Sequence, residues 1–545
     1  MKFHAALAQA FADNGLTTLF GVAGDGNLYV VDAYARLPGC TYVASAHESG
    51  ATLMALGYTT LSGKLGAATV THGTGFTNTV SALVEGVKGQ TPMLLFCADT
   101  AVEDKNHSQK VAQRELVLAT GAGFEQLRAP HTLAQDVATA IRRAWTERRP
   151  IVLNVPVDFQ WVDIDYKPVI VRIPTASGLV PTGRALDDAV GIIATAKRPI
   201  IVAGRGAMLS GARDALIRLA ARIEAPLATT LKAQNLFRGE YCNLGVFGTL
   251  SSPPAVEAIL QSDCIIAFGA SLSRYTTVKG AYLERKRVVQ CNAEIGEVGR
   301  VVQPDVAVWG DAAATAEAII HWLDEAEAPP SGFRNDALDQ NLRAYPATLA
   351  TEFSAGSRTP AGTVDIQRSL WRIDQAFPAN RIVANDAGRF LGVAFRLVTA
   401  RPGSFVHSAN SAAIGLGMGH AIGAGCADRT RPVLHITGDG GFMLGGQTEF
   451  NTAVRQKLDM VVVVCNDGAY GAEHIQFRNK DMDPASSTFQ WPDFAPVAEA
   501  LGGQGITVRS DADLDAALKL IANRDRARPL LIDLKLHPDH VPSIR

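Results

Sequence analysis

Short runs of β-branched residues and leucine alternate with longer amphipathic stretches along the whole chain of 545 residues. The first part of the chain contains the runs TTLFGV, TYVASA, GAATVT, PMLLFCA and PIVLNVP. Similar runs follow in the middle (PIIVAG, CIIAFG, RVVQCN) and in the last third (RIVAND, PVLHITG, MVVVVCN, PLLIDLKL). Such alternation is typical of parallel sheets covered by helices. We therefore predict an α/β protein with three consecutive doubly wound parallel-sheet domains.

Two segments rich in breaking residues divide these runs into three blocks. A Pro-containing connector covers about 167–182, and a segment rich in Pro, Gly, Ser and charge covers about 326–360. We expect a first domain over 1–166, a central domain over 183–325 and a third domain over 356–545. The first and third blocks could share one fold, which the sequence leaves open.

The overall composition points to a small-molecule partner. Lys and Arg number 51 against 53 Asp and Glu, so a nucleic acid or an anionic membrane would find no basic surface. The amino-terminal segment has a helical pattern without the features of a signal peptide, and no apolar stretch is long enough to span a bilayer. Seven scattered cysteines without a C-x-x-C pair fit free thiols. A cytoplasmic location is expected.

The most informative segment is PVLHITGDGGFMLGGQTEFNTAVRQKLDMVVVVCNDGAYG, residues 432–471. One predicted strand runs into Gly438-Asp439-Gly440-Gly441, and the next ends at Asn466-Asp467-Gly468. The carboxyl ends of parallel strands line the ligand crevice, where glycine lets backbone amides approach a phosphate and a carboxylate holds a hard cation. The segment predicts a magnesium and diphosphate site, with an ordinary pair of turns as the alternative.

This segment resembles the cofactor motif of the thiamine-diphosphate-dependent decarboxylase and acetolactate synthase superfamily. The resemblance implies thiamine diphosphate and Mg²⁺, and it covers essentially the whole chain. The cofactor-binding residues that it implies in the third block are Gly388, Ala412, Ile414, Gly438, Asp439, Gly440, Gly441, Asp467 and Tyr470.

Two departures from the family motif bear on the metal ligands. The second Asn of the motif is Asp467 here, and one extra residue stands before the helix, around Gly445-Gly446. Counting back from Tyr470 makes Asp467 the side-chain ligand beside Asp439, with the Ala469 carbonyl as a third ligand. Counting forward from Asp439 favours Asn466 instead. We prefer Asp467, because the loop after the strand matches without a gap.

A glycine-rich stretch, SANSAAIGLGMGHAIGAG (408–425), could be misread as a dinucleotide-binding fingerprint. That interpretation requires an acidic residue at the end of the next strand, which instead runs into GDGG. The resemblance implies that Ile414 wedges the cofactor into a bent shape and that the Ala412 carbonyl faces its amino group. A plain core isoleucine would look the same in sequence.

In the first block, TYVASAHESGATLMALGYTT (41–60) is a predicted strand, turn and helix. Glu48 stands at the helix start, where a carboxylate is favoured in any case. The resemblance implies that Glu48 bonds the pyrimidine ring of the cofactor and promotes loss of the proton from its reactive carbon. In the family this glutamate and the metal site come from different chains, so a homodimer or homotetramer with active sites at the subunit interface is implied.

Three features resemble pyruvate and indolepyruvate decarboxylases and point to an enzyme that protonates its intermediate to release an aldehyde. They place catalytic roles on Asp25 in GVAGDGNLYVVDAY, on His107 in DKNHSQ and on Glu473 after the metal loop. Those enzymes carry two histidines where only His107 stands here, and neither His72 nor His474 can be assumed to replace the second. Gln109 falls near a glutamine that acetolactate synthases use. Non-oxidative decarboxylation of a 2-oxo acid is the leading interpretation.

The alternative is a carboligase of the acetolactate synthase or benzaldehyde lyase type. FAD in the central block is not favoured, because SLSRYTT (271–277) replaces an expected arginine-rich stretch. An inactive cofactor-binding relative is disfavoured by the presence of both Glu48 and Asp439. The aromatic residues that could line a substrate pocket are Phe76, Phe390, Phe477, Phe489 and Trp491, and the polar segment 477–494 suits a loop at the site mouth.

Overall fold

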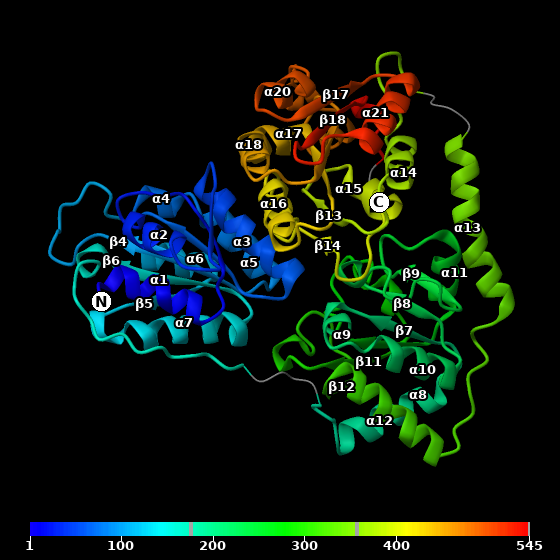
Figure 1. Ribbon diagram of the computed structural model, residues 1–545. Coiled ribbons are helices and arrows are strands. Elements are labelled where there is room, and N and C mark those ends of the chain that lie inside the picture. The colour runs from blue at the N-terminus through cyan, green and yellow to red at the C-terminus, as the bar shows by residue number, and fades with distance from the viewer. Residues whose placement is uncertain (174–177, 355–358, 543–545) are drawn as a thin grey trace. The chain divides into compact units, whose positions relative to one another are not determined.

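The computed structural model describes residues 1–173, 178–354 and 359–542. Its named strands form three sheets of six, and within each sheet all paired neighbours run parallel (Figure 1). This confirms the predicted α/β class with three parallel sheets. The start of the third domain, placed at residue 356 from the sequence, lies outside the described residues and stays a prediction.

The first sheet has the strand order β2-β1-β3-β4-β6-β5. Its strands are β1 (Thr18–Gly21), β2 (Thr41–Ala44), β3 (Gly66–Val70), β4 (Met93–Asp99), β5 (Gly123–Gln126) and β6 (Pro150–Pro156). Its helices are α1 (Phe3–Asp13), α2 (Leu28–Ala35), α3 (Glu48–Ser62), α4 (Thr74–Thr77), α5 (Val80–Gly89), α6 (Gln113–Thr120) and α7 (Leu133–Glu147). We call this part of the chain the N-block.

The third sheet has the order β14-β13-β15-β16-β18-β17. Its strands are β13 (Ile382–Asn385), β14 (Phe405–Val406), β15 (Val433–Gly438), β16 (Met460–Asn466), β17 (Gln504–Val508) and β18 (Leu530–Lys535). Its helices are α14 (Ile366–Ala376), α15 (Leu391–Leu397), α16 (Gly417–Ala427), α17 (Asp439–Gly441), α18 (Gln447–Arg455), α19 (Gly471–Asn479), α20 (Phe494–Ala500) and α21 (Asp511–Asn523). This C-block repeats the strand order of the N-block position by position, so the two blocks share one topology.

The central sheet has the order β12-β11-β10-β7-β8-β9. Its strands are β7 (Pro199–Ala203), β8 (Leu227–Thr229), β9 (Asn243–Val246), β10 (Cys264–Phe268), β11 (Arg287–Asn292) and β12 (Val306–Trp309). The helices around it are α8 (Arg184–Thr195), α9 (Arg205–Leu209), α10 (Arg213–Ile223), α11 (Pro253–Gln261) and α12 (Ala312–Glu325). None of the helices in the described ranges is long and apolar enough to cross a membrane.

The segment interpreted as the second linker contains a helix that the sequence analysis missed. Helix α13 (Asp336–Ser354) occupies much of it, with Pro346 inside. Leu338 and Leu342 pack against the hydrophobic cluster around Ile200 and Ile265. The surrounding Pro, Gly and charged residues hid a helical face that has only a few apolar positions.

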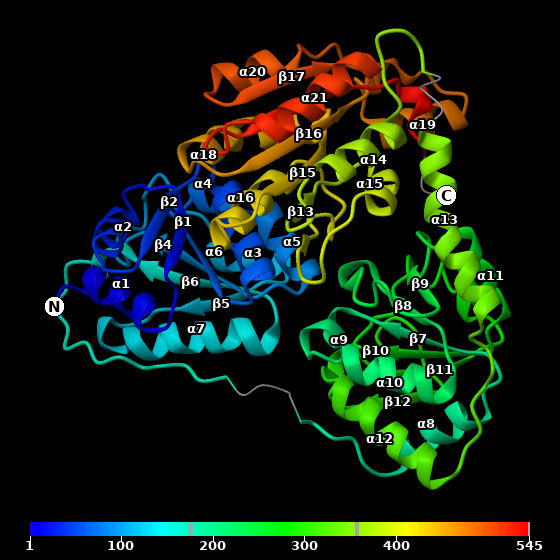
Figure 2. The same cartoon turned by 45° about the vertical axis from the view of Figure 1, so that its right-hand side comes forward.

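The described residues form two compact units. One contains the described parts of 1–173, 357–394 and 404–543, and the other those of 174–356 and 395–403. The N-block and C-block thus belong to one unit, with a hydrophobic core drawn from both. Helices α3 and α16 lie side by side at their junction in both views (Figure 1 and Figure 2).

The close approach of α3 and α16 depends on glycine. A Cβ on Gly423 of α16 would overlap the Met54 carbonyl oxygen of α3, and one on Gly57 of α3 would overlap the His420 carbonyl oxygen of α16. Every residue of α3 from Gly50 to Thr59 is buried, as expected of a helix surrounded by protein. The helix ends at Gly63, whose φ of 67° suits the left-handed cap position.

We expect Gly423→Ala to weaken this junction, because the added methyl meets backbone that cannot rotate away. The unfolding free energy should fall by about 1–3 kcal/mol, with a lower midpoint in differential scanning calorimetry. Gly191→Ala is the matched control, since Gly191 lies in helix α8 with nothing near its Cβ position. That change should be neutral or stabilise by up to about 1 kcal/mol. Equal midpoints for both variants would contradict the packing argument.

Candidate active site

Four neighbouring strands of the C-block end in residues of the candidate site, most of which were predicted from the sequence. Asp386 follows β13, residues 408–414 follow β14, Asp439 follows β15 and Asp467 follows β16. Outside the carboxyl ends of such strands is the usual ligand site of an open α/β sheet. The fold therefore brings the motif at 438–441 and the motif at 466–468, which are separated in sequence, to the same edge of the sheet.

The glycines of the first motif line a narrow cradle. A Cβ on Gly440 would lie 2.7 Å from the Tyr470 ring and 3.5 Å from Ile414 Cδ1, and a Cβ on Gly441 would overlap Asp386 Oδ2. Both glycines are buried. Five residues named from the sequence (Ile414, Gly438, Gly440, Gly441 and Tyr470) thus meet around one short stretch of backbone.

Asp439, which is buried, and Asp467, which is partly buried, form a carboxylate pair. Asp439 Oδ1 accepts from its neighbour Gly440 N at 2.9 Å and Oδ2 accepts from Trp491 Nε1 at 3.0 Å. Burial raises the pKa of Asp439, and burial together with the charge of Asp439 raises the pKa of Asp467. The nearby Arg389 opposes the shift at Asp467 only in part. A divalent cation beside both carboxylates would relieve this repulsion, so the pair fits a hard metal ion.

The metal would have to complete its shell with ligands other than acidic or imidazole side chains. Across residues 1–173, 178–354 and 359–542, no group of three or more His, Cys, Asp or Glu side chains is arranged to hold a metal ion. Backbone carbonyls and diphosphate oxygens are the remaining candidates, as is usual for Mg²⁺. The donor set is consistent with a cation bound together with a diphosphate.

Asn466, the competing ligand candidate, is turned toward another partner. Its side-chain amide donates to Asp533 Oδ1 at 2.8 Å, and Asp533 Oδ2 accepts from Phe494 N at 2.9 Å. Asp533 is fully buried in β18. The Asn466 side chain therefore ties β16 to β18, whereas Asp467 Oδ1 bonds within its own loop, to Ala469 N at 3.2 Å.

A π-helical turn lies where the resemblance predicts one extra residue. Residues Phe442–Gly446 form this turn between α17 and α18, and it includes Gly445-Gly446. A π turn is the usual way in which a helix absorbs a single insertion, and it often lies at a functional site. Met443 and Leu444 are exposed on it.

Asp386 is a site residue that the sequence analysis missed. It accepts hydrogen bonds from Ala387 N (2.7 Å), Gly415 N (2.9 Å), Leu416 N (3.3 Å) and Thr437 Oγ1 (3.1 Å). Burial nevertheless raises its pKa to about 6. Asp386 fixes the backbone just after Ile414, and its only sequence signal is an acidic residue directly after a strand, in RIVAND.

Two further predictions in the C-block concern backbone. Gly388, named as a cofactor residue, packs on the Phe390 ring, against which a Gly438 Cβ would also lie at 3.3 Å. Ala412 has φ 62°, a left-handed conformation that non-glycine residues rarely adopt. Strain of this kind tends to occur at functional sites, where surrounding contacts hold the backbone in place.

The polar segment 477–494 folds back on the loop after β16, residues 467–470. Phe489 N donates to Gly468 O at 2.7 Å, Tyr470 N donates to Ser487 O at 2.9 Å, and Trp491 bonds Asp439. The Phe489 ring stacks on Trp491 at 4.8 Å and meets Tyr470 edge-on at 4.7 Å. Of the other predicted pocket aromatics, Phe76 belongs to the hydrophobic core.

The N-block gathers its own polar groups at the matching edge. Asp25 follows β1, His72 follows β3, and His107 and Gln109 follow β4. The His72 and His107 rings lie 5.2 Å apart, and Gln109 N donates to His107 Nδ1 at 3.2 Å. Burial, then the charge of His107, lowers the pKa of His72, while Asp99, Asp25 and Gln109 oppose this. His72 thus lies beside His107, and whether it replaces the second histidine of the decarboxylases stays a prediction.

The remaining predicted groups lie apart from this cluster in the chain. Glu48 begins α3, and its Oε2 accepts from Asn78 Nδ2 at 2.9 Å. Glu473 is exposed in the first turn of α19. His474 is buried and its Nε2 lies 3.0 Å from Asp539 Oδ1, so this histidine is engaged elsewhere.

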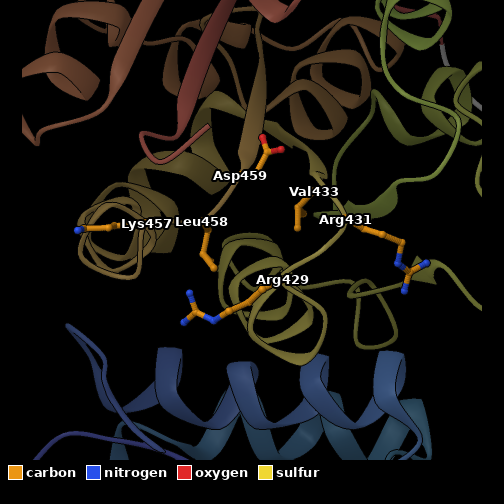
Figure 3. Close-up of a pocket in the computed structure, with 7 residues that line it drawn as sticks. Arg429, Arg431, Val433, Lys457, Leu458 and Asp459 are labelled. Atoms are coloured by element: carbon orange, nitrogen blue, oxygen red, sulfur yellow. The ribbon is translucent and has the colours of Figure 1, made fainter. Parts of the chain in front are cut away.

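A small pocket lies at the opposite edge of the C-block sheet (Figure 3). Val433 at the start of β15 and Asp459 just before β16 belong to its lining, so it lies at the amino ends of these strands. Its two arginines have partners, since Arg429 donates to Gln456 and Arg431 donates to Asp428 and Ser404. The pocket is separate from the candidate site.

Comparison with known families matches each block of the chain. The N-terminal TPP binding domain of thiamine pyrophosphate enzymes matches residues 1–120, the central domain of these enzymes matches 186–319, and their C-terminal TPP binding domain matches 386–534. The two TPP binding domain matches fall on the N-block and the C-block, whose strand ends carry the two polar clusters described above. The central domain match falls on the sheet that lies between them in the sequence.

Individual relatives align over nearly the whole chain. A "Probable 2-ketoarginine decarboxylase" of Pseudomonas aeruginosa is 28% identical over 94% of this chain and 89% of its own length. A "Probable acetolactate synthase large subunit" of Methanococcus aeolicus is 27% identical, covering 99% and 92%. A "Sulfoacetaldehyde acetyltransferase" of Alcaligenes xylosoxydans xylosoxydans is 26% identical, covering 94% and 89%. The relatives thus align with nearly the whole chain, and their names state different reactions.

Beneath the site, His435 of β15 gives the fold a pH dependence. Its side chain is 1% exposed, and burial lowers its pKa to about 4. The unfolded chain binds a proton there below about pH 6.5 while the folded chain does not. Stability contributed by the neutral ring is therefore complete above pH 6.5 and is lost as pH falls toward 4, by about 1.4 kcal/mol per pH unit.

We expect His435→Gln to remove this dependence. The difference in unfolding free energy between wild type and variant should shrink by about 2 kcal/mol between pH 7 and pH 5, as measured by denaturant titration at each pH. The packing change caused by glutamine adds only a constant offset. A difference that stays the same at both pH values would show that His435 does not titrate in this window.

Proposed function

The chain belongs to the superfamily of thiamine-diphosphate-dependent enzymes, and we propose that it catalyses the non-oxidative decarboxylation of a 2-oxo acid to an aldehyde. The observation that carries this proposal is the cluster of Asp25, His72 and His107 at adjacent strand ends of the N-block. A carboxylate beside two imidazoles is suited to delivering a proton to a substrate carbon. A relative named as a 2-ketoarginine decarboxylase is consistent with this chemistry.

The C-block would hold the cofactor. Gly438, Gly440 and Gly441 allow close backbone approach to a diphosphate, and Asp439, Asp467 and the Ala469 carbonyl would bind Mg²⁺. Thiamine diphosphate supplies, when bound, a nucleophilic carbon for the substrate carbonyl and a cationic ring that accepts the electrons of the breaking bond. Ile414 and the strained Ala412 would shape the site around the cofactor.

Glu48 would exchange a proton with the pyrimidine ring. Its Oε2 is bound by Asn78, which orients the carboxylate at the start of α3. We place this group opposite the C-block of a second chain, so that the active unit is a homodimer, or a tetramer built from such dimers. In that arrangement the exposed Glu473 would face the N-block cluster of the partner chain.

The proton-delivering groups divide into distinct roles. His72 has a lowered pKa and is neutral near pH 7, so its ring can both accept and donate a proton. His107 lies beside it on the loop after β4 and is the group through which His72 would exchange protons with the site. Asp25 provides the negative charge that stabilises either imidazole when it is protonated.

A carboligase is the second candidate, and one observation favours it. Gln109 lies beside the histidine pair, with its backbone amide bonded to His107 Nδ1. An amide can bind the carbonyl of a second substrate without supplying an acidic proton, which would direct the reaction toward an acyloin or acetohydroxy acid. Relatives named acetolactate synthase and sulfoacetaldehyde acetyltransferase are consistent with such a reaction, with or without FAD.

Product analysis would decide between these reactions. Purified protein with thiamine diphosphate and Mg²⁺ would be incubated with pyruvate, 2-oxoisovalerate, phenylpyruvate, indolepyruvate, benzoylformate and 2-ketoarginine. We expect free aldehyde as the main product, with aldehyde formation reduced about 100-fold in His72→Ala and His107→Ala. His131→Ala, at an exposed histidine of the N-block, should behave as wild type. Acyloin or acetolactate without free aldehyde would refute the decarboxylase proposal and favour the carboligase.

The metal assignment gives a separate prediction. We expect Asp467→Ala and Asp439→Ala to weaken Mg²⁺-dependent cofactor binding roughly tenfold or more, because each removes a ligand. Asn466→Ala should lower thermal stability through the loss of the bond to Asp533, with Mg²⁺ affinity changed less than about threefold. Trp491, which bonds Asp439, provides the fluorescence signal for the titration. A larger loss of Mg²⁺ affinity in Asn466→Ala would reverse the assignment.

A further inference from the structure

Two buried glutamates join the N-block and the C-block within one chain. Glu449 of α18 is 2% exposed and Glu85 of α5 is 1% exposed. An ionisable side chain is rarely buried so fully unless it is bonded, and leaving it unbonded is costly. The proposed reaction assigns a role to neither residue.

Glu449 binds the turn that leads into Glu48. Its Oε1 accepts from Ala46 N at 3.2 Å and from His47 N at 3.0 Å, and Oε2 lies 3.3 Å from Ala46 N. Gly50 is required beside it, because a Cβ there would overlap Glu449 Oε1. The carboxylate of a C-block helix thus fixes two successive backbone amides directly before the catalytic glutamate of the N-block.

Glu85 makes the reciprocal contact. Oε1 accepts from Asn410 N at 3.0 Å and Asn410 Nδ2 at 2.6 Å, and Oε2 accepts from Ser411 N at 2.8 Å and Ser411 Oγ at 2.6 Å. These residues directly precede Ala412, the left-handed residue of the cofactor loop. Burial alone raises the pKa of Glu85, but the charge of His420 and these bonds bring it below its ordinary value.

The two contacts are equivalent in topology. Helix α5 connects β3 to β4, and α18 connects β15 to β16, which hold the same places in the two sheets. Each helix carries one buried glutamate, and each glutamate binds the turn before the helix that follows the edge strand of the other block. The contacts therefore form a reciprocal pair across the junction of α3 and α16.

We propose that Glu449 and Glu85 are positioning residues, Glu449 for Glu48 and Glu85 for the Ala412–Ile414 loop. This inference rests on the proposed function, because it needs Glu48 to act on the cofactor. Each carboxylate holds successive backbone amides in one orientation, so the side chain or carbonyl that follows is fixed before any ligand arrives. For Glu48, such preorganisation acts on the reacting step more than on binding, because a small displacement of a catalytic group is enough to slow it. For the Ala412–Ile414 loop, it acts on how the cofactor is held.

The test for Glu449 is hydrogen–deuterium exchange at the reactive carbon of bound thiamine diphosphate, followed by NMR after rapid quenching. We expect Glu449→Ala to slow exchange at least tenfold while the cofactor dissociation constant changes less than threefold. Glu449→Gln should recover most of the rate, because the amide oxygen can still accept from Ala46 N and His47 N. In steady state the loss should fall on kcat rather than KM.

Asp374→Asn is the matched control for a purely structural effect. Asp374 is a buried carboxylate of α14, ion-paired with Arg381 and distant in sequence from both turns. Its variant should lose stability and keep the wild-type exchange rate. If Glu449→Ala exchanges as fast as wild type, or is slowed no more than Asp374→Asn, the positioning role is wrong. Should the alanine variant fail to fold, Glu449→Asp takes its place, because the shorter side chain does not reach the two backbone amides. The same criterion then applies to its exchange rate.

The arm for Glu85 uses a different readout. We expect Glu85→Gln to lose the bond from Ser411 N, to change the near-ultraviolet circular dichroism of the bound cofactor and to weaken cofactor binding about tenfold, with Glu85→Ala more affected. Wild-type affinity and spectrum in both variants would overturn this half of the proposal.

Glu48→Gln distinguishes failure of the proposed function from failure of the positioning role alone. If it exchanges like wild type, the proposed function itself fails, whereas abolished exchange there with normal exchange in the Glu449 variants refutes only the positioning role.

Discussion

The contact between α3 and α16 is the constraint on which the rest of the candidate site depends. The two helices approach so closely that Gly57 and Gly423 face carbonyl oxygens of the opposite helix. This crossing fixes the start of both helices, and the segments that matter for chemistry lie there: Glu48 at the start of α3 and the loop carrying Ile414 just before α16. Backbone contact of this kind leaves little freedom for the N-block and the C-block to slide against each other. The turns before α3 and α16 therefore hold Glu48 and Ile414 in fixed positions.

The surroundings of each polar group in this unit determine which charge state of that group is favoured. Asp439 and Asp467 are held together at a price in repulsion that a cation would remove, while Asp386 and Glu85 are surrounded by donors that stabilise their charges. His72, by contrast, is kept neutral by burial. Under the proposed function, the C-block edge would hold a metal with its anionic ligand and the N-block edge would transfer protons, although both edges belong to the same topology.

Local sequence patterns were sufficient for the sheets and for most of the residues at strand ends, although Asp386 after β13 was missed. Hydrophobic runs predicted the three parallel sheets, and the glycine motif located Asp439, Gly440 and Gly441 at one strand end. Patterns failed where a contact joins segments far apart in the chain. The Asn466–Asp533 bond, the Trp491 donor and the bonds of Glu85 and Glu449 have no periodic signature, because each depends on packing that arises only when the blocks meet. Helix α13 was missed because few of its side chains are buried.

The π turn at Phe442–Gly446 has a consequence for helical phase. In a regular α-helix one added residue rotates every later side chain by about 100° around the axis. The wider turn absorbs that residue locally, so the chain before it still presents Asp439 to the metal loop and the chain after it still presents Glu449 to the N-block. An insertion in the middle of the motif therefore leaves the directions of the side chains at both ends unchanged. Its trace is confined to the bulge, where Met443 and Leu444 project outward and give this surface a shape that an uninterrupted helix would not have.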